Sequence, residues 1–375
     1  MNTGNTPGSK RARPAGRWPA GMRDRLTQLG RRLDVFQQFI RFPAFGFSAM
    51  LPLLGAATVA RQLSAQQVAG IVCVALAFHS FSYVLNDVID LPVDRTQALR
   101  SDAPLVRGLI RPGPALIFAL LQAPVALIVT AWLGGGSAAY VALSASFVLM
   151  AVYDVWGKRA VLPPATDVIQ GLAWGALVFY GAGLQSGPTT SLTICLFAFV
   201  VVYIVLLNGV HGSLRDLSND LACGLRSTAI WFGARPRAAQ QLAIPLRFKL
   251  YAWAMQALSI GWLVWPLLQN VFGYGPAAWA ATFVVVLFLS ARCLRLLAII
   301  LAPNSSQADR ARAVGAYLFA SLSSVVALFA LYLEPGLLIV LLIACLAPLL
   351  PKQVRHVVSA LKAAPATPAT KARSG

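Results

Sequence analysis

Long apolar runs recur along almost the whole chain, and most have the length needed to cross a bilayer. They lie near residues 41–60, 66–86, 113–133, 137–156, 165–184, 189–212, 249–269, 276–300, 313–333 and 336–350. A hydrocarbon core about 30 Å thick is spanned by roughly 20 residues of helix. Because lipid offers no hydrogen-bond partners, the backbone of such runs must pair within helices. The sequence therefore predicts an all-α, polytopic membrane helical bundle.

The composition excludes an ordinary soluble domain. Only 11% of the 375 residues are charged, against about 25% in soluble proteins. The net charge is nevertheless +19. In a membrane protein this basic excess sets orientation and attracts anionic head groups, so we expect contacts with membrane lipids and no nucleic-acid partner. The five cysteines are far apart and do not have the spacing of a metal centre or a disulfide framework.

The placement of Lys and Arg predicts the topology. If all ten runs cross the membrane, every Lys and Arg except Arg61 falls on one side. Positive loops are cytoplasmic, so we expect both termini and the functional end in the cytoplasm, with a bacterial plasma membrane as the location. We divide the chain into a basic tail over 1–40, a transmembrane domain over 41–350 and a basic tail over 351–375.

The segment before the first apolar run has the pattern of an amphipathic helix. Its apolar residues recur at intervals of three and four, at Met22, Leu26, Leu29, Leu33, Phe36 and Ile40. Arginines fall between them, which favours a helix lying in the cytoplasmic interface.

Acidic residues are scarce, and five of the twelve fall into two short clusters. The first cluster, after the second run, contains Asn86, Asp87, Asp90 and Asp94. On a helix, positions 86, 90 and 94 share a face, with position 87 alongside. Carboxylates grouped in this way repel one another unless a cation is present, and short oxygen ligands suit Mg²⁺.

The second cluster, after the sixth run, contains Asp216 and Asp220. Asn208, His211 and Arg215 precede it on an adjoining helical face. Both clusters follow even-numbered runs and should therefore lie on the same side of the membrane. A solvated polar loop is the alternative interpretation for either cluster.

Basic residues follow the same ends of the runs. They include Arg100, Lys158, Arg159 and Arg226. Each taken alone is a topology anchor; together with the acids around one opening they suit a metal–diphosphate ligand.

These residues resemble the motifs of the UbiA superfamily of intramembrane prenyltransferases. The superfamily's first Asp-rich motif is similar to Asn86-Asp87-x-x-Asp90-x-x-x-Asp94, and its second to Asp216-x-x-x-Asp220 with the tail Gly224-Leu225-Arg226-Ser227-Thr228. Tyr153 with Lys158-Arg159 resembles the end of the family's fourth helix, and Arg41 with Pro43 its first-helix arginine. The chain departs from the family in its tenth apolar run and in Asn219, where many relatives carry further acids.

The resemblance implies nine transmembrane helices, here with a tenth apolar segment, together with Mg²⁺ and an isoprenyl diphosphate donor. The clustered Asn and Asp residues would then hold the metal, and Arg41, Arg100, Tyr153, Lys158, Arg159, Asn208, His211 and Arg226 would contact substrate. The expected activity is prenyl transfer to a small aromatic or lipid acceptor. A terpene cyclase of the same superfamily and an ion-coupled transporter remain alternatives, and the oligomeric state stays open.

Overall fold

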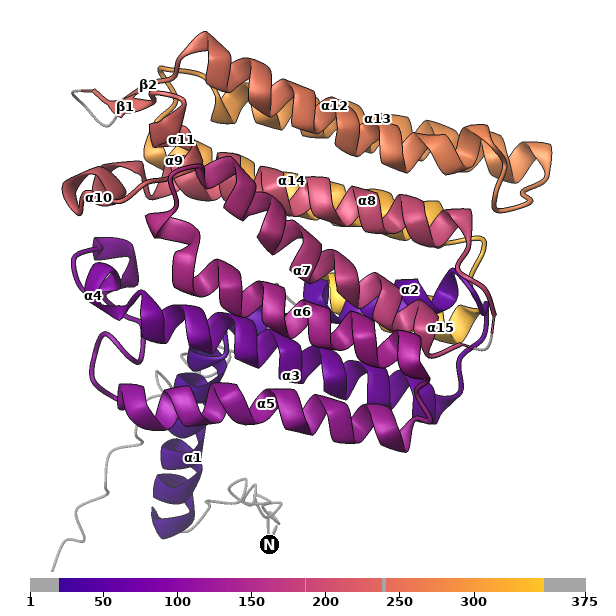
Figure 1. Ribbon diagram of the computed structural model, residues 1–375, viewed down its shortest axis with the longest axis horizontal. Coiled ribbons are helices and arrows are strands. Elements are labelled where there is room, and N and C mark those ends of the chain that lie inside the picture. Colours follow the sequence, from indigo (N-terminus) through magenta and orange to yellow (C-terminus); the bar gives the residue numbers. More distant parts are fainter. Residues whose placement is uncertain (1–19, 186, 238–240, 347–375) are drawn as a thin grey trace, which may run out of the picture.

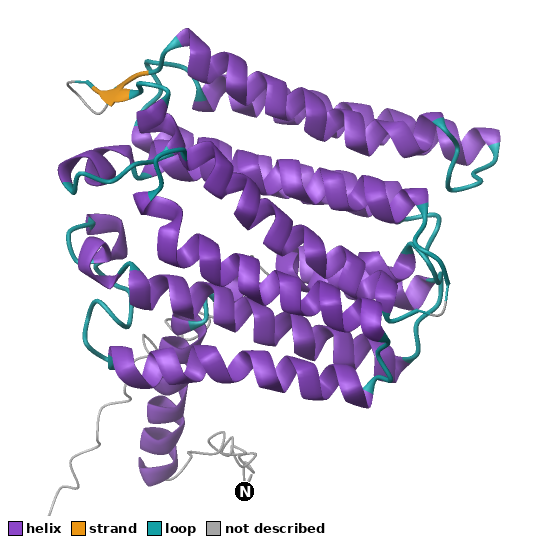
Figure 2. Cartoon of the chain, viewed as in Figure 1, coloured by secondary structure: helices purple, strands orange, loops and turns teal. Residues whose placement is uncertain are grey.

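The computed structural model describes residues 20–185, 187–237 and 241–346, and most of them are helical (Figures 1 and 2). The long helices are α1 (Ala20–Phe39), α2 (Phe45–Ala57), α3 (Ala65–Ile89), α5 (Pro112–Trp132), α6 (Ser137–Trp156), α7 (Pro163–Gly183), α8 (Ser191–Val205), α12 (Leu246–Leu268), α13 (Pro276–Ile300), α14 (Gln307–Phe329) and α15 (Pro335–Leu346). The predicted all-α bundle is confirmed. In Figure 1 the bundle helices run roughly side by side, while α1 runs across their direction.

Short elements lie between the long helices. They are η1 (Phe42–Ala44), α4 (Leu91–Asp94), η2 (Ala98–Arg100), η3 (Gly157–Arg159), η4 (Leu206–Gly212), α9 (Ser213–Arg215), α10 (Leu217–Ala222), α11 (Thr228–Trp231), β1 (Arg235–Pro236) and β2 (Leu242–Ala243). The two strands pair antiparallel, with Arg235 opposite Ala243.

Six helices of the described chain are long and apolar enough to cross a membrane, or seven if the second half of α1 and α2, bent by 56°, count as one span. The chain is thus a multi-pass membrane protein, while the count of nine or ten spans stays a prediction. The last predicted run, 336–350, extends beyond the described residues, within which α15 has only 12 residues.

The outer helices expose apolar side chains, as a lipid-facing surface requires. On α5, for example, Ile117 and Ile128 are 61% and 68% exposed. The central helix α3 instead buries Phe78, His79 and Val84 completely. The helix predicted before the first run is α1, where Leu29, Leu33 and Phe36 are about half exposed. Phe36 and Phe39 both contact the Phe118 ring of α5.

Helices α2 and α7 approach closely because glycines face the opposite backbone. A Cβ at Gly55 would collide with the Val178 carbonyl, and one at Gly181 with the Pro52 carbonyl. Small residues permit such approach in membrane bundles, where packing rather than the hydrophobic effect holds helices together.

The helices are irregular at the end that carries the acidic motifs. Helix α3 ends at Ile89, and Pro92, which cannot donate a backbone hydrogen bond, lies in the first turn of α4. The acidic face predicted over 86–94 therefore spans two helices rather than one. Hydrogen bonds from Asp90 N to Asn86 O (2.8 Å) and from Asp94 N to Asp90 O (2.8 Å) keep the helical register across the junction.

We predict that Gly181→Ala destabilises the protein by about 1–3 kcal/mol, because the added methyl group overpacks the α2–α7 crossing. Gly315→Ala is the matched control, since a Cβ at this exposed α14 position meets nothing within 4 Å. Thermal unfolding of both variants in detergent measures the effect. Equal unfolding temperatures would contradict the close approach of α2 and α7.

Candidate active site at the end of the bundle

The two acidic motifs lie together at one end of the bundle, where Figure 1 shows α4 next to α10. The Thr96 hydroxyl, just after the first motif, donates to Asn219 Oδ1 at 3.1 Å. The Gln97 amide donates to Asp216 Oδ1 at 2.6 Å. These bonds join segments more than a hundred residues apart in sequence, as expected for one shared site.

Guanidinium groups hold the carboxylates of the first motif. Asp87 is 4% exposed and accepts from both Arg41 and Arg100, the latter at 2.6 Å. Arg100 Nε also donates to Asp94 Oδ2 at 2.9 Å. Charge-assisted bonds of this kind offset the large penalty of burying an ion.

Burial and charge act in opposite directions on these groups. Burial raises the pKa of the Asp94 carboxyl, although Arg100 beside it acts to lower that pKa. Burial alone would lower the pKa of Arg100, but the neighbouring Asp87 and Asp94 raise it overall. Arg100 is therefore firmly positive at neutral pH.

The amide of Asn86 is oriented by an acid from another helix. Its Nδ2 donates to Asp154 Oδ1 of α6 at 3.2 Å. With the nitrogen committed, the Asn86 carbonyl oxygen remains as the acceptor. Asp154 Oδ2 is buried and has no hydrogen-bond partner in the described structure.

The second motif is bonded in a similar way. Arg215 donates through Nε to Asp216 Oδ1 at 2.9 Å and through Nη2 to Asp216 Oδ2 at 2.7 Å. Asp220 is buried on the short helix α10, at 4% exposure. The motif follows η4, a π-helical stretch, and such bulges often occur at functional sites.

A further buried acid, Asp167 of α7, connects several predicted site residues. Asn208 Nδ2 donates to Asp167 Oδ1 at 2.8 Å and to the Tyr153 hydroxyl at 2.5 Å. The hydroxyl of Thr228, in the tail of the second motif, donates to Asp167 Oδ2. Asp167 was not among the predicted site residues, although an acid inside an apolar run is a signal that could have identified it.

His211 lies on η4 and is 4% exposed. Its ring lies 4.6 Å from that of Tyr317 on α14. Neither ring nitrogen has a hydrogen-bond partner in the described part of the chain. In the described structure no hydrogen bond therefore joins the His211 ring to the acidic motifs.

Not every predicted basic residue joins the acids. Arg159 and Arg226 are exposed, and Arg226 lines a hollow of about 220 Å³ with Val161, Ile230 and Trp231. The side chain of Lys158 lies outside the described structure. In the described structure no ion pair joins Arg159 or Arg226 to the acidic motifs.

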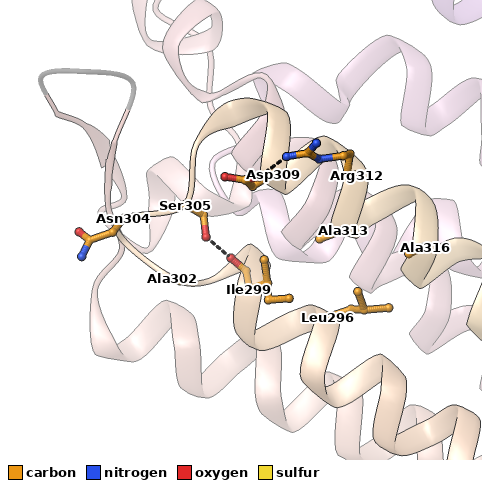
Figure 3. Close-up of a pocket in the computed structure, with 9 residues that line it drawn as sticks. All are labelled: Leu296, Ile299, Ala302, Asn304, Ser305, Asp309, Arg312, Ala313 and Ala316. Carbon is orange, nitrogen blue, oxygen red and sulfur yellow. Dashed lines mark hydrogen bonds and ion pairs between the residues drawn. The ribbon is translucent and has the colours of Figure 1, made fainter.

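A larger hollow, of about 550 Å³, lies between the end of α13 and the start of α14 (Figure 3). Its charged groups, Asp309 and Arg312, pair with each other at 2.5 Å. No residue of either acidic motif lines it, so we do not assign the site there.

The donor chemistry at the bundle end fits Mg²⁺. Both motifs offer only Asn and Asp oxygens, the ligands that this hard cation prefers. Within residues 20–185, 187–237 and 241–346, no three Asp, Glu, His or Cys side chains are grouped to hold a metal alone. Phosphate oxygens would have to complete the coordination, as is usual for Mg²⁺.

A model of the UbiA prenyltransferase family matches residues 48–300. The chain belongs to this family. The resemblance seen in the sequence motifs is thereby confirmed.

Among curated family relatives, a polyprenyl transferase, ausN, of Aspergillus calidoustus is 27% identical over 48% of this chain and 46% of its own. A 4-hydroxybenzoate octaprenyltransferase of Burkholderia mallei is 26% identical over 51% of this chain and 64% of its own. The chain thus matches less than two thirds of the length of these relatives.

Solved structures of the family share the fold. A UbiA homologue from Aeropyrum pernix K1 aligns over 77% of this chain and 98% of its own, with a TM-score of 0.59 and 17% identity. A homologue from Archaeoglobus fulgidus bound to DMAPP and Mg²⁺ aligns over 79% of this chain and 98% of its own, with a TM-score of 0.55 and 16% identity.

Arg41 has a left-handed backbone conformation, with φ 50° and ψ 42°. This conformation costs a non-glycine residue about 1–2 kcal/mol, so the position is held for its side chain. We predict that Arg41→Gly is more stable than Arg41→Ala by about 1 kcal/mol, although both lose the ion pair to Asp87. Unfolding temperatures in detergent test this. A less stable glycine variant would contradict the left-handed geometry.

Proposed function

We propose that this UbiA-family protein is an intramembrane prenyltransferase that moves an isoprenyl group from an isoprenyl diphosphate to an acceptor. The observation that carries the proposal is the meeting of both acidic motifs at one end of the bundle, with Arg41 and Arg100 against Asp87. Carboxylates and guanidinium groups side by side match the two charges of a metal–diphosphate ligand.

We assign Mg²⁺ binding to Asn86, Asp87 and Asp90 in the first motif and to Asp216 and Asp220 in the second, with Asp94 completing the first set. When bound, Mg²⁺ neutralises diphosphate and stabilises its departure. Arg41 and Arg100 would contact phosphate oxygens, and Lys158, Arg159 and Arg226 would approach the ligand from the surrounding loops.

The reaction breaks the bond between the allylic carbon and the diphosphate oxygen, and the electron pair leaves with diphosphate. Aromatic rings beneath the acids suit the carbon that becomes electron-poor. Tyr83 and Trp174 have centroids 6.2 Å apart, and Phe47 lies 5.6 Å from Trp174 and 5.5 Å from Tyr203. The acceptor then forms the new bond and releases a proton.

An acceptor that is a small aromatic molecule or a lipid fits this chemistry. We assign Tyr153, Asn208 and His211 to substrate contacts on the inner side of the site, since they lie on α6 and η4 next to the motifs. The relatives include a 4-hydroxybenzoate octaprenyltransferase, which supports an aromatic acceptor here.

The acidic end should face the cytoplasm of a bacterial plasma membrane. The excess of Lys and Arg at this end supports that orientation. The exposed apolar residues of α1, flanked by exposed Arg25, Arg31 and Arg32, support a position for α1 in the same interface.

We predict that Asp87→Asn and Asp216→Asn each lower kcat by about 100-fold or more, because each removes a charged metal ligand from the leaving-group site. Asp309→Asn, at an α14 acid whose side chain is 47% exposed, is the matched control and should keep full activity. Transfer of labelled geranyl or longer diphosphates to a panel of phenols measures activity, with and without EDTA. Metal-independent turnover, or normal rates in both site variants, would refute the two-motif site.

The orientation is tested by single cysteines in a variant without the native ones. We expect Leu109→Cys, near the acidic end, to be protected from an impermeant thiol reagent in intact cells. Thr189→Cys, on the loop before α8, should react. Both positions are exposed in the folded chain, so the opposite pattern would place the acidic end outside.

A further inference from the structure

His79 contacts the segments on both sides of Arg41, although it lies on another helix. It is completely buried on α3. Its Nε2 lies 2.8 Å from the Ile40 carbonyl oxygen, and its Nδ1 lies 2.7 Å from Ser48 Oγ. A carbonyl can only accept, so Nε2 carries the proton and donates to Ile40, and Nδ1 accepts from the Ser48 hydroxyl. Both nitrogens of the neutral ring are thereby satisfied.

The Ile40 carbonyl needs this donor because the helix stops there. Helix α1 ends at Phe39, and the chain bends by 56° at Arg41 before η1 and α2. Carbonyls in the last turn of a helix have no partner within the helix. In the described structure no backbone N–H donates to Ile40 O. His79 therefore caps the end of α1.

Three residues on one face of α3 contact residues 40 and 41. His79, Tyr83 and Asp87 are spaced four apart and share this face. His79 holds the Ile40 carbonyl, the Tyr83 ring lies 5.1 Å from the Arg41 guanidinium, and Asp87 pairs with that guanidinium. The His79 and Tyr83 rings are themselves 4.6 Å apart.

We propose that His79 is a positioning residue for the active site, which fixes the bend at Arg41 so that its guanidinium reaches Asp87. We call the bonds of His79 to Ile40 and Ser48 the latch. The effect of the latch on the reaction rate rests on the prenyl transfer proposed above, whereas the existence of the latch does not. Loss of the latch frees the bend and displaces Arg41 from the acidic motif. A displacement of about 1 Å can lower an enzyme's rate about 100-fold.

The test compares His79→Leu, which removes both bonds, with His79→Gln, whose amide can still donate to Ile40. Ser80→Ala, which changes a buried neighbour on the same helix α3, is the control. We expect kcat/KM to fall about 10- to 100-fold in His79→Leu, and to recover at least in part in His79→Gln. In an Arg41→Ala background, His79→Leu should change the rate by less than about twofold, because residues that act through one another are not additive.

Amide hydrogen exchange of residues 36–45 measures whether the latch is intact, and this measurement does not depend on enzymatic activity. We expect faster exchange at the Arg41 and Ala44 amides in His79→Leu and a smaller increase in Ser48→Ala, which disturbs the fold less. Unchanged exchange in both variants, or rate losses that multiply with that of Arg41→Ala, would overturn the proposal. If the wild-type protein transfers no prenyl group, the proposed function fails, and hydrogen exchange alone decides on the latch.

Discussion

The pairing of buried carboxylates with guanidinium groups is the interaction on which the acidic end of this bundle depends. An unpaired charge near hydrocarbon is expensive, and removing one partner of a buried pair typically costs about 3–5 kcal/mol. Asp87 alone accepts from Arg41 and Arg100, which lie on either side of it in sequence. Together these bonds tie the break before α2 and the loop after α4 to the end of α3. The acids therefore determine the backbone arrangement at this end of the bundle as well as its charge.

Regular helix forms the lipid-facing part of the molecule, whereas the backbone around the acidic motifs is irregular. Where lipid surrounds the chain, long helices satisfy their own hydrogen bonds, as at α13. Around the motifs the backbone is interrupted by the left-handed Arg41, by Pro92 and by the π-helical η4. Such irregularity is tolerated where protein groups replace the lost backbone partners, as His79 does for Ile40.

Sequence alone predicted the features that depend on local pattern. The apolar runs predicted the helices within a few residues, and the spacing of Asn86, Asp90 and Asp94 predicted their common face. It could not predict partners chosen by distant parts of the chain. That Gln97 bonds Asp216, or that Asp167 holds both Asn208 and Thr228, depends on how five or more helices pack. The π-helical turn in η4 has no clear sequence signal, because its residues also suit an ordinary helix.

The internal ion pairs also explain why the proposed site suits a ligand that combines a divalent cation with a negatively charged diphosphate. A divalent cation alone would have to displace Arg41 and Arg100 from Asp87, leaving two guanidinium groups without partners. Diphosphate alone would draw those groups away and leave the carboxylates unpaired. If both bound together at the proposed site, the carboxylates would turn to the cation and the guanidinium groups to the phosphates, and every charge would keep a partner. Binding only one of the two would leave buried charges unpaired, at a cost like that of breaking a buried pair. The ion pairs would therefore favour the joint binding of metal and diphosphate over the binding of either one.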